Sequence, residues 1–198
     1  MSTTGAISSA TGRRAVFLDR DGVINENLDG SYVHCWADFR FLPGALEAVA
    51  ALSRAGYAVV VVTNQAGIAR GRMTEAALRA IHDQMIAAVA AAGGRLDAVL
   101  YCPHHPDDGC ACRKPQPGLF YRAAAELGLD LARSAFVGDT VTDLQAGLAA
   151  GCRPILVLTG LGRRARELAA ADPDLAGLPV VADLPAAVEL LLAAGSPA

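Results

Sequence analysis

The chain has 198 residues, of which 53% are hydrophobic and 19% charged, with a formal net charge of −3. This composition indicates a globular domain with a sizeable core and argues against a disordered chain or a basic binder of nucleic acid or membrane surfaces. No apolar run reaches the roughly 18–20 residues that cross a bilayer. Residues 1–14 are small and polar and lack the apolar stretch of a secretory signal, so we expect a disordered N-terminal segment and a cytoplasmic protein.

Short β-branched runs alternate with alanine- and leucine-rich segments along the chain. The runs predict strands buried on both faces, and the longer segments predict helices. The expected strands are residues 16–18, 58–62, 96–101, 135–137, 155–158 and 180–181, and the expected helices are residues 44–55, 74–92, 118–127, 141–150 and 184–192. Alternation of this kind predicts an α/β fold with a parallel sheet, and we expect one domain over residues 15–194.

Polar side chains follow four of these strands directly. They are Asp19, Thr63, Cys102 and Asp139. Open parallel sheets bind ligands beyond the carboxyl ends of their strands, so the chemistry should converge on one edge.

Two carboxylates, Asp19 and Asp21, stand two positions apart after the first strand. Such spacing can turn both toward one cleft. One carboxylate can then attack phosphorus, while the other protonates the leaving oxygen and later activates water. Alone, the pair is equally compatible with a solvated loop.

A second acidic motif places Asp139 after the fourth strand and Asp143 one helical turn later. Capping of the helix would explain Asp139, but hard oxygen ligands for Mg²⁺ are the functional interpretation. The turn from Thr63 to Gly71 offers a hydroxyl and backbone N–H groups to phosphate oxygens, or is an ordinary turn.

Lys114 is the only lysine in a chain with 16 arginines. A solubilising surface cation could readily be arginine in such a chain, whereas a site that needs a compact ammonium could not. We therefore expect Lys114 to stabilise a transferring phosphoryl group.

Three of the five cysteines lie within one short stretch that also contains two histidines. Cys102, His104, Cys110 and Cys112 make a three-thiolate, one-imidazole set, the composition of a closed structural zinc site. His105 is a competing ligand, and reduced core cysteines are the alternative. Cys35 and Cys152 stand alone and are expected to be packing residues rather than ligands, and His34 and His82 are expected to be surface or packing residues.

Taken together, the motifs resemble the four motifs of the haloacid dehalogenase-like phosphatases. Phe17 to Asn25 resembles the first, Thr63 the second, Lys114 the third, and Gly138-Asp139 with Asp143 the fourth. The resemblance implies a Rossmann-like three-layer α/β/α fold with a minimal cap. It implies that Asp19 is the nucleophile and Asp21 the general acid and base, and that Thr63 and Lys114 stabilise the phosphoryl group.

The same resemblance implies the ligands. Mg²⁺ would be held by Asp19, the Asp21 carbonyl and Asp139, and structural Zn²⁺ by the cysteine–histidine loop. Contacts to a phosphorylated sugar would come from four further residues: Asn64, Gln65, Arg113 and Thr140. Arg113 is our candidate for a second substrate anion, because its planar guanidinium can grip a phosphate in a bidentate way.

The cysteine–histidine loop narrows the resemblance to the branch of D,D-heptose 1,7-bisphosphate and histidinol-phosphate phosphatases. In both, zinc shapes a loop in place of a large cap. Two positions depart from the usual pattern, Ala66 for serine and Thr140 for lysine, and both touch expected phosphate contacts.

The leading hypothesis is hydrolysis of the 7-phosphate of D-glycero-D-manno-heptose 1,7-bisphosphate, on the ADP-heptose route to lipopolysaccharide core. The alternatives are a histidinol-phosphate phosphatase and a zinc-stabilised binding module without catalysis. We expect a monomer with no nucleic-acid or membrane partner.

Overall fold

The computed structural model describes residues 12–28 and 32–195. Its strands are β1 (Ala15–Leu18), β2 (Ala58–Asn64), β3 (Ala98–Cys102), β4 (Ala135–Gly138), β5 (Arg153–Val157) and β6 (Val180–Val181). Its α-helices are α1 (Ala45–Arg54), α2 (Glu75–Ala91), α3 (Gly118–Leu127), α4 (Val141–Ala149), α5 (Gly162–Ala169) and α6 (Leu184–Gly195). Three short 3₁₀ helices are η1 (Trp36–Asp38), η2 (Pro106–Asp108) and η3 (Leu131–Arg133).

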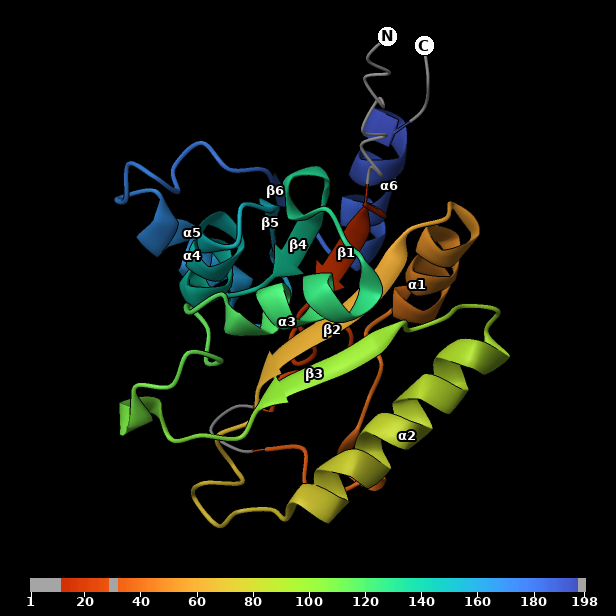
Figure 1. Ribbon diagram of the computed structural model, residues 1–198, viewed down its shortest axis with the longest axis vertical. Helices are drawn as coiled ribbons and strands as arrows, with labels where there is room; N and C mark the ends of the chain where they lie inside the picture. The colour runs from red at the N-terminus through yellow and green to blue at the C-terminus, as the bar shows by residue number, and fades with distance from the viewer. Residues whose placement is uncertain (1–11, 29–31, 196–198) are drawn as a thin grey trace, which may run out of the picture.

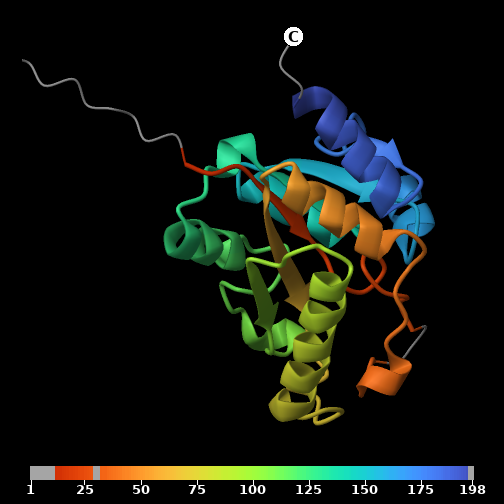
Figure 2. The same cartoon turned by 90° about the vertical axis from the view of Figure 1, so that its right-hand side faces the viewer.

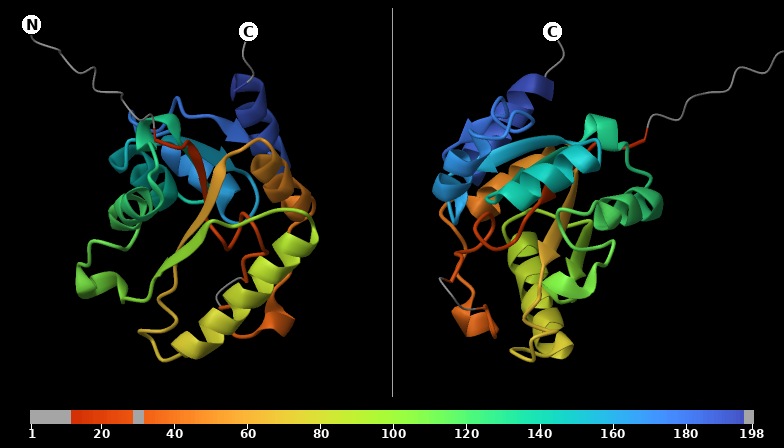
Figure 3. Two further views of the ribbon diagram at one scale, coloured as in Figure 1. Left: turned by 45° about the vertical axis from the view of Figure 1, so that its right-hand side comes forward. Right: turned by 90° about the vertical axis from the view of Figure 1, so that its left-hand side faces the viewer.

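The six strands form one parallel sheet in the order β3-β2-β1-β4-β5-β6. Alternate residues of the strands supply two cores. Val16 and Leu18 of β1 face a core shared with α1, α2 and α6. Phe17 faces a second core shared with α3 and α4, where its ring packs against Phe120 of α3, which in turn packs against Phe136 of β4. Helices therefore cover both faces of the sheet, as Figures 1 and 3 show.

The predicted three-layer α/β/α architecture with a parallel sheet is confirmed, and the elements differ from expectation mainly at their ends. One helix, α5, was not predicted, because Gly162–Ala169 contains three arginines and offers only a narrow apolar face. Within the segment expected to be disordered, Arg13 instead pairs with Leu129, and residues 1–11 lie outside the described part. No helix among the described residues is long and apolar enough to cross a membrane.

The segments that follow the strands overhang one edge of the sheet. The connection after β1 carries η1 and an aromatic group of Trp36, Phe39 and Phe41, whose ring centroids lie 4.9 to 6.0 Å apart. The connection after β3 carries the cysteines and ends at α3. Figure 2 shows the first of these connections (η1, orange) at the same end of the molecule as the start of α2.

Candidate active site

A buried lysine bridges two carboxylates where β1 and β4 end. The Lys114 Nζ lies 2.8 Å from Asp19 Oδ1 and 2.7 Å from Asp143 Oδ1, and it donates to the Val62 carbonyl at 3.0 Å. Strand register explains the meeting, because Leu18 pairs with both Val61 and Val137. The single lysine of the chain is thus only 4% exposed, and it supplies the compact charge that the sequence predicted.

Burial and charge act in opposite directions on this cluster. Burial would lower the pKa of Lys114, but Asp143 and Asp19 raise it, so the amine stays charged. Burial raises the pKa of Asp19 to about 6 against the opposing charge of Lys114. Burial, together with Asp143 and Asp19, raises the pKa of Asp139 well above its usual range. Carboxylates crowded in this way need a further cation to be ionised together.

Asp139 fits the role of a ligand for such a cation. It is fully buried, its Oδ2 accepts from the Leu161 N–H at 2.8 Å, and its Oδ1 has no hydrogen-bond partner among the described residues. Ligand oxygens of Asp19, Asp139 and Asp143 lie within 4.8 Å of one another. This all-oxygen set is what Mg²⁺ prefers. Gly22 and Gly160 border it, and a Cβ at either would collide with the Asp139 carboxylate.

Asp143 does two tasks that the sequence did not assign to it. Its Oδ2 accepts from the Asp139 N–H at 3.2 Å, the Thr140 N–H at 3.0 Å and the Thr140 hydroxyl at 2.7 Å, while its Oδ1 faces Lys114. It therefore caps α4 and positions the lysine. Thr140, which was expected to contact the substrate, lines the pocket, but its hydroxyl is hydrogen-bonded to Asp143 in the N-terminal cap of α4.

Asp21 is held by donors on all sides. The guanidinium of Arg20 reaches both of its oxygens, at 2.8 and 2.9 Å, Asn25 donates to Oδ1 at 2.9 Å and Gln65 to Oδ2 at 2.9 Å. Burial would raise the pKa of Asp21, but the charge and hydrogen bonds of Arg20 lower it below its usual value, with help from Asn25 and Gln65. Asp21 is ionised in this arrangement.

Three other predicted residues sit at the end of β2. Thr63 and Gln65 line the pocket, and the Gln65 amide donates to the Thr63 hydroxyl at 3.0 Å as well as to Asp21. Asn64 pairs with the backbone of Lys114 in both directions, at 3.1 Å each. Gln65 and Asn64 thus have a fixed supporting arrangement in addition to any contact with substrate.

These side chains surround a pocket of about 200 Å³ at the carboxyl edge of the sheet. Its walls include residues the sequence did not single out, in the connection after β1 and at the start of α4: Asn27, Leu28, Tyr32, Val33 and Thr142. No motif or spacing marked the first four, because they come from an irregular connection. Arg113 is not among the lining residues, although its Nη1 is buried and has no partner in the described part of the chain.

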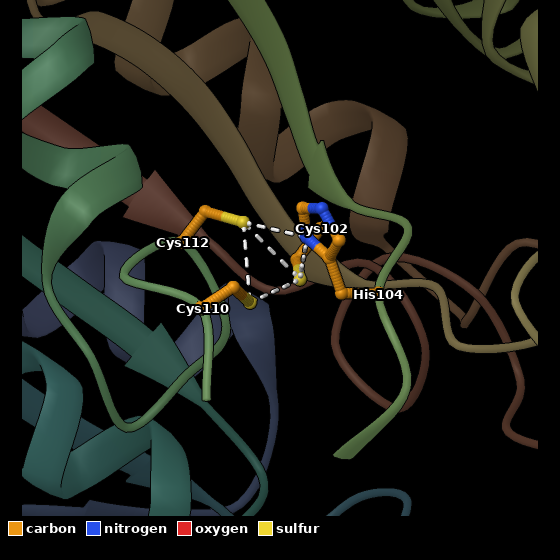
Figure 4. Close-up of side chains that lie close together, drawn as sticks. All are labelled: Cys102, His104, Cys110 and Cys112. Carbon is orange, nitrogen blue, oxygen red and sulfur yellow. Dashed lines mark hydrogen bonds between the residues drawn. The ribbon is translucent and has the colours of Figure 1, made fainter. Parts of the chain in front are cut away.

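The four predicted zinc ligands meet after β3, as Figure 4 shows. The sulfurs of Cys102, Cys110 and Cys112 lie 3.3 to 3.6 Å apart, and His104 Nδ1 lies 3.5 Å from the Cys102 sulfur and 3.2 Å from that of Cys112. Thiolates about 2.3 Å from one tetrahedral zinc would be ~3.8 Å apart, close to this arrangement. The set could therefore hold Zn²⁺ after a small expansion.

His105, the competing ligand, is not part of this group of four. It is the N-cap of η2, where its Nδ1 accepts from the Asp107 N–H at 3.4 Å. Cys152 is buried, as expected for a packing residue, but Cys35 is exposed, so that prediction was wrong for it. His34 is exposed and His82 is buried.

The cysteine–histidine loop, residues 102–112, is hydrogen-bonded to the start of α3. The Gly118 N–H donates to the Ala111 carbonyl at 3.0 Å, and a Cβ on Gly118 would collide with that carbonyl. Lys114 lies two residues after Cys112 and four before Gly118, so the backbone that carries the lysine runs between the candidate metal site and α3.

Comparison with known proteins gives concordant results. Residues 10–147 match the family model of haloacid dehalogenase-like hydrolases, and residues 111–187 match a HAD-hydrolase-like model. The chain is 50% identical over 151 residues to D-glycero-β-D-manno-heptose-1,7-bisphosphate 7-phosphatase of Bordetella bronchiseptica, covering 76% of this chain and 84% of that protein. It is 44% identical over 183 residues to the Yersinia pestis protein of the same name, covering 88% and 95%.

Solved structures agree. The crystal structure of D,D-heptose 1,7-bisphosphate phosphatase from B. bronchiseptica, complexed with magnesium and phosphate, is similar with a TM-score of 0.83 and 46% identity, covering 92% of this chain and 99% of that one. The corresponding Burkholderia thailandensis structure gives a TM-score of 0.67 and 41% identity, covering 91% and 99%. The chain belongs to the haloacid dehalogenase-like hydrolase family, in the branch that includes the D-glycero-β-D-manno-heptose-1,7-bisphosphate 7-phosphatases.

Proposed function

We propose that the protein removes the 7-phosphate of D-glycero-β-D-manno-heptose 1,7-bisphosphate through an aspartyl-phosphate on Asp19. The observation that carries the chemistry is the buried Lys114 between Asp19 and Asp143 at the floor of the pocket. The choice of substrate rests on similarity to heptose-1,7-bisphosphate 7-phosphatases that are 44 to 50% identical to this chain over the aligned residues. A cytoplasmic location and a monomeric state stay predictions of the sequence.

The reaction divides into two steps. In the first, a carboxylate oxygen of Asp19 attacks phosphorus, the bond from phosphorus to the sugar oxygen breaks, and Asp21, once protonated, gives its proton to that oxygen. In the second, Asp21 takes a proton from water, the water oxygen bonds to phosphorus, and the bond to Asp19 breaks to release phosphate. Lys114 and the Thr63 hydroxyl face the charge that spreads over the phosphoryl oxygens.

Mg²⁺, held by Asp19, Asp139 and the Asp21 carbonyl, would supply positive charge that draws the substrate phosphate to Asp19 and offsets its repulsion. The partnerless Oδ1 of Asp139 supports this assignment. Zn²⁺ on the four ligands of the cysteine–histidine loop has a structural role, because a closed three-sulfur, one-nitrogen site leaves no open position for chemistry.

Arg113 is our candidate for the second anion of a bisphosphate. It precedes Lys114, follows the zinc ligand Cys112, and has a buried Nη1 with no partner in the described part of the chain. Because Arg113 is adjacent to Lys114 in the chain, we expect its guanidinium to contact a substrate group at the mouth of the pocket. A phosphate oxygen there would satisfy the guanidinium.

The test is phosphate release, measured side by side on heptose 1,7-bisphosphate, histidinol phosphate and fructose 1,6-bisphosphate. We expect kcat/KM to be highest for the heptose substrate by at least about tenfold. A preference for histidinol phosphate would show that the proposed substrate is wrong, while the aspartyl-phosphate mechanism would still stand. Activity on none of the three, with Mg²⁺ present, would contradict the proposed function.

A further inference from the structure

We propose that His82, on α2, is a positioning residue for catalysis that orients Arg20, whose guanidinium in turn fixes the carboxyl group of Asp21 at the pocket. This inference rests on the proposed function, because it gives a task to a side chain remote from the reacting atoms. The three residues form a continuous chain from the helix layer to the active site.

Arg20 is buried to an extent unusual for an arginine. It is only 1% exposed, and it is the largest of the fully buried side chains. A buried guanidinium must find partners for its N–H groups. Its Nε and Nη2 donate to Asp21, at 3.2 Å and 2.8 to 2.9 Å, and Nη1 lies 3.1 Å from His82 Nε2.

The backbone of Arg20 is fixed as well. Its carbonyl accepts from the N–H groups of Ile24 at 2.8 Å and Asn25 at 3.1 Å, which closes the turn after β1. With the backbone fixed and the side chain buried, the contacts of the guanidinium set the direction of its plane. One edge of that plane meets Asp21 and the other meets His82.

His82 is suited to accept from Arg20. It is 5% exposed on the inner face of α2, and its ring lies 5.7 Å from that of Tyr101. Burial and the charge of Arg20 lower the pKa of His82 to about 3, so the ring is neutral and Nε2 can be the acceptor. The adjacent ionisable groups on the packed elements are Arg20 and Asp21 from the first connection, Tyr101 from β3, and Glu75 and Arg79 of α2, which bond with Tyr101 or with each other.

A purely structural pairing and a positioning role differ in what they predict for different leaving groups. Asp21 matters for phosphoryl transfer from an alkyl phosphate, whose leaving oxygen needs a proton. It matters much less for p-nitrophenyl phosphate, whose leaving group departs as the anion. Loss of Asp21 positioning should therefore depend on the leaving group, whereas general loosening of the fold should not.

The experiment compares His82→Leu, which removes the acceptor, with His82→Gln, whose amide oxygen can replace it. For the Leu variant we expect kcat/KM on an alkyl monophosphate to fall about 10- to 100-fold, and on p-nitrophenyl phosphate less than about threefold. The Gln variant should recover most of the difference. Met85→Leu, in the same buried face of α2, is the matched control and should change neither substrate.

Circular dichroism and thermal unfolding show whether the Leu variant is folded. If it is not, His82→Asn, whose shorter amide does not reach the position of Nε2, replaces it in the leaving-group comparison, and His82→Gln stays the rescue. Equal losses on both phosphates, or no loss on either, would overturn the positioning role. Failure of the proposed function is distinguishable, because it appears in the unaltered protein as no activity on either phosphate.

Discussion

The phosphoryl site and the cysteine–histidine loop stand a few residues apart, yet different forces hold them. Asp19, Lys114 and Asp143 are placed by the ends of parallel strands and by a helix cap, inside the core. The loop from Cys102 to Cys112 offers one buried ligand and three half-buried or exposed ones, and we expect a bound metal to stabilise it. The strands and the helix cap fix the first region, whereas loss of the metal should loosen the second.

The largest expected effect comes from the first region. Asp19→Asn keeps the shape of the side chain and removes the attacking charge, so kcat should fall by about three orders of magnitude or more. Zinc content and folding should be unaffected, because the strands still place the residue. Phosphate release measures the loss of kcat, and elemental analysis measures the zinc content. Near-normal turnover would contradict a covalent mechanism.

Arg113 connects the two regions, because it lies between Cys112 of the cysteine–histidine loop and Lys114 of the phosphoryl site. Arg113→Ala tests its role. Losing a charged hydrogen bond typically costs roughly 1.5–3 kcal/mol, so kcat/KM for heptose bisphosphate should fall about 10- to 100-fold. A monophosphate without the second anion should lose much less. Equal losses on both would place Arg113 in the shared phosphoryl site, and no loss on either would make it a solvated loop residue.

Cys110→Ala removes one of the four candidate zinc ligands of the cysteine–histidine loop. We expect less than about half an equivalent of zinc, a lower Tm and roughly tenfold lower activity, because Lys114 retains its strand-end partners but its loop loosens. Cys35→Ala, which changes an exposed thiol outside the loop, is the control and should leave zinc and activity unchanged. Full activity in zinc-free protein would show that the loop needs no metal.

The smallest expected effect is a pH dependence of Mg²⁺ binding. Burial raises the pKa of Asp19 to about 6 and that of Asp139 in the same direction. Without Mg²⁺, the folded protein binds more protons than the unfolded chain from about pH 4 upward, so this contribution to stability is lost as pH rises through the folded pKa values.

A cation that replaces those protons should therefore stabilise the protein more at high pH. We expect the Mg²⁺-induced rise in Tm to be a few degrees larger at pH 8 than at pH 5. Asp139→Asn should reduce the difference. An equal rise at both pH values would place Mg²⁺ elsewhere.

The sequence predicted the parts whose placement follows from periodicity or from a motif. The strands, the four members of the zinc set and the acidic residues at strand ends are of this kind. It did not predict the partnerships of side chains that meet through tertiary packing. Arg20 with His82 and Asp143 with Lys114 join residues 62 and 29 positions apart, and no local pattern marks such pairs.

The predicted substrate contacts show the same limit. Thr140 and Asn64 both line the pocket, but the sequence did not predict their further hydrogen bonds, from Thr140 to Asp143 and from Asn64 to the backbone of Lys114. Cys35 was expected to pack, but its place in an irregular connection leaves it exposed. Irregular segments carry least periodicity, so their exposure is decided by contacts that the sequence does not show.

Direct detection of the aspartyl-phosphate tests the central claim. The protein is acid-quenched during turnover of heptose bisphosphate, reduced with borohydride, digested and analysed by mass spectrometry. Because an acyl phosphate is reduced to an alcohol and a free carboxylate is not, Asp19 alone should appear as homoserine, and only when substrate was present. Reduction at Asp21, Asp139 or Asp143 instead, or none at any aspartate during rapid turnover, would contradict the account.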